Sequence, residues 1–175
     1  IHTGQNPTFR AINRLDRGTS GLMTCAKNKL AAHRLEELLS NDGIRRTYHA
    51  VCEGTGLPES GTIDLPIGRA EGKGIMRCVR EDGQHAVTHY RVLTTRNNRT
   101  LLEIRLETGR THQIRVHLKH LGFPLFGDFL YHPDFRYIGR QSLHSWKLEF
   151  VHPITGAPMQ FQAEIPEDMK VFTEK

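Results

Sequence analysis

The chain has 175 residues, of which 37% are hydrophobic and 25% are charged, and its formal net charge is +5. This length suits one domain with a real core, and the absence of an apolar run near the roughly 20 residues that span a bilayer excludes an integral membrane protein. The positive charge suits a polyanionic partner without requiring one. Three widely spaced cysteines, Cys25, Cys52 and Cys78, argue against a disulfide framework and favour a reducing cytoplasm.

In chain order, the first predicted elements are a short strand and a helix. Residues 22–26 have the composition of a strand. Residues 28–41 carry leucines and alanines along one helical face, with Asn28 able to cap the start and Gly43 just beyond the end. The clearest helix in the chain is therefore expected here.

Further strands are predicted before a second helix. Residues 47–53, 87–94 and 101–106 are rich in β-branched, aromatic or alternating side chains. The Gly- and Pro-rich residues 54–74 predict an irregular surface loop. Residues 111–121 then predict a second helix, because apolar side chains recur at the i, i+4 and i+7 spacing.

The last predicted elements are two strands, at residues 143–151 and 159–165. Three stretches have the composition of hairpin turns: Asp82-Gly83, Asn97-Asn98 and residues 152–158. Because hairpins join antiparallel strands, we expect an α+β domain, built as a mixed, largely antiparallel β-sheet flanked by helices.

The stretch "INRLDRGTSG" at residues 12–21 places one carboxylate, Asp16, between Arg14 and Arg17. Taken by itself, it is most simply a loop carboxylate that its neighbours neutralise, followed by an ordinary turn. A second basic stretch surrounds the start of the predicted helix at residues 111–121, where backbone N–H groups favour phosphate. On that helix, Arg115 could be held firmly enough to pair with a carboxylate from elsewhere in the chain.

Four stretches in the same order together decide between these interpretations. They are "NRLDRGTSG", "RRTYHAVCEG", "GRTHQIRVHLKHLGFPLFGD" and "LHSWKLEFVHPITGAPMQFQAEIPEDM". In this order, and over almost the whole chain, they resemble the RluA family of RNA pseudouridine synthases. The resemblance implies an enzyme that isomerises specific uridines of rRNA or tRNA to pseudouridine.

The resemblance implies roles for three side chains. The catalytic aspartate of the family falls on Asp16, its active-site tyrosine on Tyr48, and the arginine of its H-Q-I/L-R motif on Arg115. Asp16 would act at C1′ or on the base, with Arg115 holding it in place. Tyr48 would stack on the uracil or help to move the C5 proton. Whether Asp16 adds to the base, bonds to the sugar or takes a proton from C2′ stays open.

Six more side chains are expected to contact RNA. The arginine of the first motif resembles one that fills the space left by an extruded uridine. The hydroxyl of Thr19 can bond a phosphate or its own turn. The six are Arg14, Arg17, Thr19, Arg110, His112 and Gln113. Other basic residues, Arg46 among them, are candidate phosphate contacts as a set, although each one taken singly is expected to be a solvated surface charge.

The chain departs from the family at one position and in its extent. The family has histidine where this chain has Asn13, and asparagine cannot take up a proton near neutrality, so only a structural or RNA-contact role can survive there. The family also places strands, and in many members an S4-like RNA-binding domain, before the first motif. We expect residues 1–175 to form one pseudouridine synthase catalytic domain that lacks both.

The implied reaction needs no cofactor. The spacing of His112, His117 and His120 does not fit a metal-binding ladder, and we expect no metal. Trp146 is expected in the core, since it alternates with apolar residues along a strand.

We expect a cytoplasmic monomer that binds rRNA or tRNA and no membrane. Two alternatives remain: a non-catalytic RNA-binding or assembly module with the same fold, and a glycosidase-like hydrolase, which would need a second catalytic carboxylate.

Overall fold

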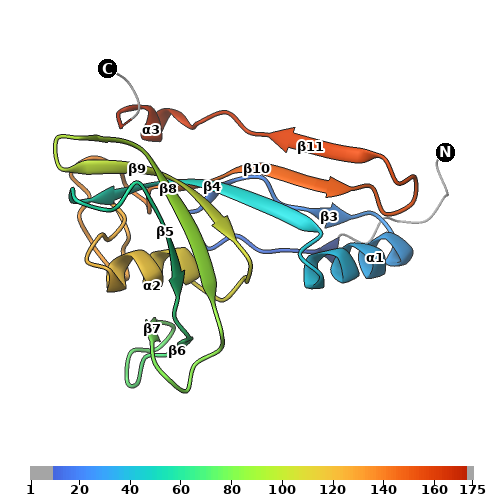
Figure 1. Ribbon diagram of the computed structural model, residues 1–175, viewed down its shortest axis with the longest axis horizontal. Coiled ribbons are helices and arrows are strands. Elements are labelled where there is room, and N and C mark those ends of the chain that lie inside the picture. The colour runs from blue at the N-terminus through green and yellow to red at the C-terminus, as the bar shows by residue number, and fades with distance from the viewer. Residues whose placement is uncertain (1–9, 173–175) are drawn as a thin grey trace.

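A twisted β-sheet forms the centre of the computed structural model, which describes residues 10–172 (Figure 1). Its main path runs in the order β11-β10-β4-β9-β8-β5, and β2 pairs with β10 off this path. The bounds are β2 (Ser20–Gly21), β4 (Ile44–Glu53), β5 (Ser60–Asp64), β8 (Val87–Arg96), β9 (Arg99–Leu106), β10 (Leu143–Val151) and β11 (Pro158–Gln162). All neighbours on the main path are antiparallel, whereas β2 runs parallel to β10. The predicted mixed, largely antiparallel sheet is confirmed.

Three helices and two small strand pairs complete the described part of the chain. The helices are α1 (Lys29–Ser40), α2 (Gln113–His120) and α3 (Glu167–Lys170). The strand pairs are β1 (Arg10–Ala11) with β3 (Cys25–Ala26), and β6 (Ile67–Arg69) with β7 (Arg77–Val79). Both predicted helices are confirmed, and Asn28 caps α1 as expected, its Oδ1 accepting a hydrogen bond of 2.8 Å from the backbone N–H of Ala31. In the described residues, no helix is both long and apolar enough to cross a membrane.

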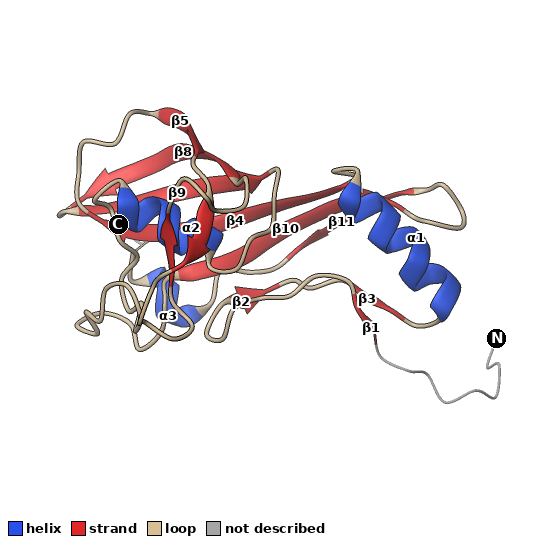
Figure 2. Cartoon of the chain, turned by 90° about the horizontal axis from the view of Figure 1, so that it is seen from below, coloured by secondary structure: helices blue, strands red, loops and turns tan. Residues whose placement is uncertain are grey.

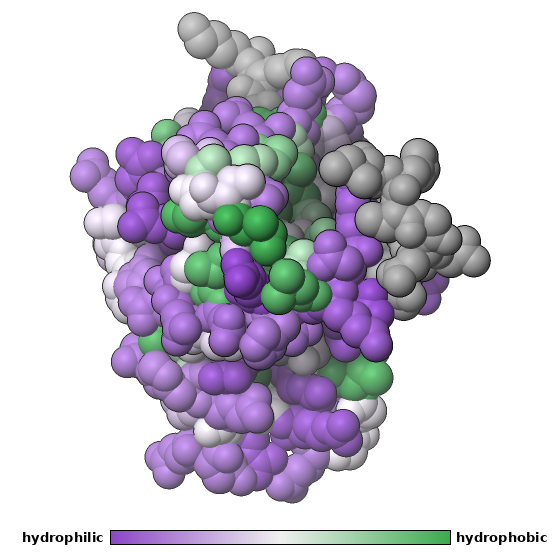
Figure 3. All heavy atoms as spheres, turned by 90° about the vertical axis from the view of Figure 1, so that its right-hand side faces the viewer, coloured by the Kyte–Doolittle hydropathy of each residue, from purple (hydrophilic) through white to green (hydrophobic). Residues whose placement is uncertain are grey.

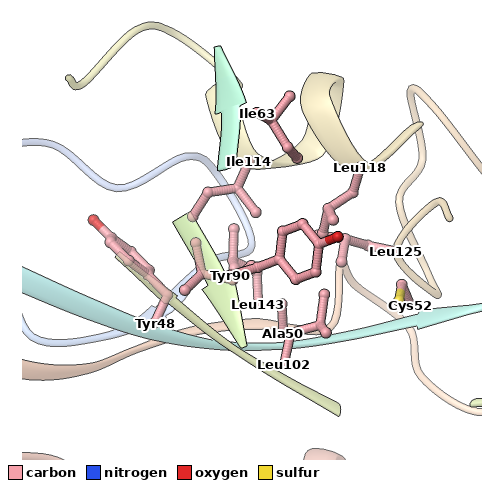
Figure 4. Packing of buried hydrophobic residues seen from close by; sticks show 11 residues of the cluster. Tyr48, Ala50, Cys52, Ile63, Tyr90, Leu102, Ile114, Leu118, Leu125 and Leu143 are labelled. Atoms are coloured by element: carbon pink, nitrogen blue, oxygen red, sulfur yellow. The ribbon is translucent and has the colours of Figure 1, made fainter. Parts of the chain in front are cut away.

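The helices cover the sheet from both sides (Figure 1). On one side, α2 packs Ile114 and Leu118 against Ala50 and Leu102 of the sheet (Figure 4). On the same side, α1 buries a second cluster around Ile44 at the other end of β4. Residues of the opposite face of the sheet form a third cluster with α3. The alternation of side chains along β4 thus places Tyr48 on the α2 side, at the margin of a packed core.

The β10–β11 hairpin and α1 lie at one end of the molecule. A guanidinium nitrogen of Arg34 donates a 2.8 Å hydrogen bond to the carbonyl of Pro153 in the hairpin turn, and the rings of Phe150 and Phe161 stack with their centroids 6.1 Å apart. Figure 3 views this end and shows apolar side chains surrounded by polar ones. The end is therefore held by both polar and apolar contacts.

Two of the three predicted hairpins are confirmed. Asn97 and Asn98 join β8 to β9. Their φ values of 50° and 58° are left-handed, as the two central residues of a type I′ hairpin turn require. Residues 152–158 join β10 to β11. The prediction at Asp82-Gly83 is wrong, because β7 pairs with β6 rather than with β8. This dipeptide makes only a local turn, in which the N–H of Gly83 bonds the carbonyl of Arg80.

The prediction of an irregular loop at residues 54–74 is also wrong. This stretch contains β5, which forms an edge of the main sheet, and β6. The strand contains Gly61, where a Cβ would lie only 2.6 Å from the hydroxyl of Tyr90 on the neighbouring β8, so the close approach of the tyrosine accounts for the glycine. At residues 22–26 the strand is shorter than predicted, since only Cys25 and Ala26 pair.

Candidate active site

A cavity of about 630 Å³ lies between the loop at residues 11–19, β4 and the start of α2. Asp16, Tyr48 and Arg115, which are far apart in the sequence, all line it. The loop leaves the β1–β3 pair, runs beside the sheet to β2 and returns (Figure 2). The structure thus brings together the three side chains that the sequence predicted to act together.

The carboxylate of Asp16 is paired with the guanidinium of Arg115. Nη1 of Arg115 donates to Oδ2 of Asp16 over 3.1 Å. The side chain of Arg115 is 1% exposed, whereas that of Asp16 is 24% exposed. The pair therefore has a buried cation behind a carboxylate that a molecule in the cavity can reach.

A second carboxylate, that of Asp128, orients the same guanidinium. Nε and Nη2 of Arg115 each donate a 2.7 Å hydrogen bond to Asp128, which is the two-point geometry that fixes the plane of an arginine. Asp128 also accepts hydrogen bonds from the backbone N–H groups of Leu130 and Tyr131. Burial lowers the pKa of Arg115, but Asp128 and then Asp16 raise it above its usual value overall, so Arg115 stays charged.

The sequence reasoning missed Asp128. It ends the stretch "GRTHQIRVHLKHLGFPLFGD", where it follows Gly127 in a turn. An acid at the end of a basic stretch was a possible signal, but nothing in the spacing indicated which arginine it would bind. Its role depends on the return of the chain after α2.

Tyr48 is buried at the edge of the main core, and Figure 4 shows its hydroxyl directed away from the other side chains of the cluster. Burial raises the pKa of Tyr48, with Arg46 partly opposing and Asp16 adding to the rise. The hydroxyl therefore keeps its proton near neutral pH. An aromatic ring and a protonated hydroxyl are both available to a bound base.

Backbone contacts fix the shape of the loop that carries Asp16. Gly21 has a φ of +106°, and a Cβ there would lie 2.2 Å from the backbone oxygen of Ser145, since β2 runs directly beside β10. The Nε2 of Gln141 donates to the backbone oxygen of Arg17 and to the hydroxyl of Thr19. The hydroxyl of Thr19 thus already has a partner within the protein, while the side chains of Arg14 and Arg17 are exposed.

Asn13 has a structural contact. It is buried, and its Oδ1 accepts a 2.8 Å hydrogen bond from the N–H of Thr24 on the returning arm of the loop. Its Nδ2 lies buried without a partner among the described residues. This contact requires an acceptor but no titratable group, which accounts for asparagine at this position.

The remaining predicted RNA contacts lie around the start of α2. Gln113 is buried, and its amide bonds Val87, Thr88, Thr108 and Arg110 within the protein. Its contact with RNA stays a prediction, as does that of Arg110, which is exposed and donates from Nε to the carbonyl of His85.

His112 has the left-handed φ of 59°, and its Nδ1 lies 2.8 Å from the hydroxyl of Tyr131. Burial, followed by the charge of Arg115, lowers the pKa of His112. His112 is therefore neutral near pH 7 and would meet RNA as a hydrogen-bonding group, not as a cation.

The prediction that Trp146 lies in the core is wrong. A β-bulge between Ser145 and Lys147 interrupts the alternation on which that prediction depended. Trp146 is only partly buried and stacks on His49, with the ring centroids 4.3 Å apart.

One group of potential metal ligands comes together among residues 10–172, and it lies outside the cavity. Glu53, His132 and Asp134 approach one another there. Nε2 of His132 lies 2.8 Å from a carboxylate oxygen of Glu53, and Arg136 pairs with both Asp134 and Glu53. Arg136 thus already supplies a cation to both carboxylates of the group. The histidines of the α2 region, His112, His117 and His120, are not part of the group.

The antiparallel sheet with a carboxylate–arginine pair in a cavity defines an α+β class of protein, and comparison with known proteins gives the family. The model of the RNA pseudouridylate synthase family matches residues 2–120. The chain belongs to this family, and the RluA-type resemblance is confirmed.

Among similar proteins, an uncharacterized RNA pseudouridine synthase of Bacillus subtilis, YjbO, is 47% identical over 95% of this chain and 59% of its own length. Ribosomal large subunit pseudouridine synthase D of Xanthomonas campestris is 42% identical over 94% of this chain and 54% of its own length. The chain thus spans somewhat more than half the length of these relatives. The solved structure of human RNA pseudouridylate synthase domain containing 1 aligns with a TM-score of 0.79 and 27% identity, over 90% of this chain and 69% of that one.

Proposed function

We propose that this protein isomerises uridines of RNA to pseudouridines, with Asp16 as the catalytic carboxylate. The observation that carries the proposal is the pair of Asp16 with the buried Arg115, placed at the wall of a cavity large enough for a nucleotide. Family membership and the names of the relatives support the same reaction.

In this reaction the bond between N1 and C1′ breaks, the uracil turns and a new bond joins C5 to C1′. C5 gives up its proton to water and N1, freed from the sugar, takes one up, so the proton count is unchanged. Asp16 would attack or stabilise the reacting centre, and Arg115 would keep its carboxylate in position. Tyr48 would lie against the freed base and keep it from leaving. No cofactor takes part, because the overall composition of the RNA does not change.

Large-subunit rRNA is the substrate that the relatives' names favour, since those of Xanthomonas campestris and Vibrio cholerae are named for it. tRNA is the other substrate class. We place the reaction in the cytoplasm and assign it to a monomer. The pairing of Asp16 argues against a purely RNA-binding module, because a carboxylate facing polyanionic RNA would only weaken binding.

The test follows the proton that leaves C5. RNA transcripts of the ribosomal large subunit carrying tritium at uridine C5 should release label to water in the presence of this protein. Asp16→Asn should lower release at least about 1,000-fold while leaving RNA binding nearly unchanged, since it removes only the reacting charge. Asp64→Asn, an exposed carboxylate on β5 outside the cavity, serves as the matched control. Equal release by Asp16→Asn would remove this residue from the mechanism, and binding without release by the wild type would identify a non-catalytic module.

A further inference from the structure

Arg46 is a buried cation without an anionic partner. It lies on β4 and is 9% exposed, so it is not the solvated surface charge that was expected of it singly, whereas its place among the candidate phosphate contacts stays a prediction. Its Nε is buried and has no hydrogen-bond partner, and none of the ion pairs found between residues 10 and 172 includes its guanidinium. Burying the Nε of a charged guanidinium without a hydrogen-bond partner is unfavourable, so the position calls for an explanation.

Arg46 also lines the same cavity as Asp16 and Tyr48. It precedes Tyr48 by two residues on one strand, so the two side chains lie on the same face of the sheet. A Cβ on Gly109 would lie 3.0 Å from Nη1 of Arg46, which shows that the glycine leaves room for the guanidinium against the loop before α2.

The other charged groups of the cavity are already engaged or exposed. Arg115 is matched by Asp16 and Asp128. The carboxylate of Glu107 lies 2.6 Å from Nε2 of His89. Arg14 and Arg110 reach the solvent. Arg46 is thus the buried cation of the cavity that remains open to an anion from outside the protein.

We propose that Arg46 binds a phosphate group of the reacting nucleotide, on its 5′ or its 3′ side. This inference rests on the proposed function, because it assigns to RNA the anion that completes the cavity. Two residues along a strand span about 6.8 Å, a distance comparable to that between the sugar of a nucleotide and its own phosphates. A uridine with its base against Tyr48 and its C1′ near Asp16 would therefore bring a phosphate to the guanidinium, whose planar donors match phosphate oxygens.

Small probes test the site without the need for turnover. Uridine, uridine 5′-monophosphate and uridine 3′-monophosphate are titrated by calorimetry or by NMR. We expect the wild type to bind one of the monophosphates at least about tenfold more tightly than uridine, as a charge-assisted hydrogen bond implies, and the better of the two identifies the phosphate. Arg46→Gln should reduce this preference to about twofold or less, and Arg46→Lys should keep an intermediate preference.

Arg45→Gln is the matched control. Arg45 is the adjacent residue on β4, is exposed and does not line the cavity, so the variant loses the same charge and should keep the full preference for the monophosphate. Thermal melting adds a second readout. Arg46→Gln should melt at a higher temperature than the wild type, because an unpaired buried charge has been removed.

The proposal fails if the wild type binds uridine and both monophosphates equally or none of them, if Arg46→Gln keeps the preference, or if Arg46→Gln melts lower or does not fold. Failure of the proposed function gives a different result. Phosphate-dependent binding through Arg46 without tritium release would leave the anion site in place and refute the isomerase. Tritium release with no effect of Arg46→Gln on monophosphate binding would support the isomerase and refute the anion site at Arg46.

Discussion

One arginine serves two carboxylates in this cavity, and the two differ in exposure. Asp128 is buried and binds Arg115 through two nitrogens, whereas Asp16 is reachable and binds through one. The buried acid therefore sets the plane of the guanidinium, and the remaining nitrogen sets the direction of the carboxylate of Asp16, which we propose to react. Asp128 is a positioning residue in this scheme, since it does not line the cavity.

Replacing Asp128 by asparagine should separate position from chemistry. We expect Asp128→Asn to lower kcat about tenfold or more with little change in KM, because Asp16 loses its fixed orientation while the RNA contacts remain. It should also lower the free energy of unfolding by about 3 kcal/mol, since the buried guanidinium of Arg115 loses one of the two carboxylates that balance its charge. Tritium release and urea denaturation measure the two effects.

Asp134→Asn is the control for Asp128, because Asp134 makes a similar two-point pair with Arg136 in the same segment, outside the cavity. It should leave kcat unchanged and lower the free energy of unfolding by less than Asp128→Asn, since the side chain of Arg136 is 65% exposed and stays hydrated when it loses its partner. A fall in kcat of the same size in both variants would refute a specific role for Asp128.

At the scale of the element, the short parallel contact between β2 and β10 fixes the loop that carries Asp16. Gly21→Ala would place a Cβ 2.2 Å from the oxygen of Ser145, so either β2 must leave β10 or the sheet must shift. We expect a loss of about 3 kcal/mol in the free energy of unfolding, with activity reduced further because the loop moves. Urea denaturation and tritium release check both.

Gly56→Ala separates the clash from backbone strain. Gly56 has a similar φ of +98° but nothing within 4 Å of the position of a Cβ. It should lose only about 1 kcal/mol, the usual effect of a left-handed alanine. Equal losses in the two variants would show that the contact with β10 is unimportant.

Elements with a local signal could be predicted, and those that depend on distant partners could not. The cap at Asn28 and the turn at Asn97-Asn98 are written in neighbouring residues, so they were predictable. The strand β5 pairs with β8, where Gly61 leaves space for Tyr90, which is 29 residues further along, and no local pattern reveals that partner. In the site, the pairing of Asp16 with Arg115 could be predicted from the motifs. The burial of Arg46 could not, because it depends on the loop before α2, where Gly109 lies against the guanidinium.

At the scale of the whole molecule, buried histidines should make the fold sensitive to mild acid. Burial lowers the pKa of His49, His112, His117 and His144. A histidine with a lowered folded pKa binds protons more readily when unfolded, so its stabilising effect is complete above the unfolded value near 6.5 and is lost as the pH falls below it. We expect the free energy of unfolding to decrease between about pH 7 and pH 5, before most carboxylates titrate.

His117 is the clearest test of this acid sensitivity. It is fully buried, with Nδ1 2.9 Å from the hydroxyl of Thr88 and Nε2 2.9 Å from the carbonyl of Leu65. His117→Gln should lower stability at pH 7 but flatten its decline toward pH 5, as measured by urea denaturation across the range. His152→Gln, partly exposed in the β10–β11 turn, should leave the slope unchanged. An unchanged slope in His117→Gln would show that other groups cause the acid sensitivity.

The anchoring of the loop at residues 12–24 has a consequence for the energetics of catalysis. Asn13 fastens one arm, Gln141 supports the middle, and the contact of β2 with β10 secures the tip. Its backbone thus has its working shape before RNA arrives, and little conformational entropy remains to be lost there on association. In the proposed reaction, binding energy from the rest of the RNA would then be free to extrude the uridine from its stack, a step needed wherever the uridine lies within a helix.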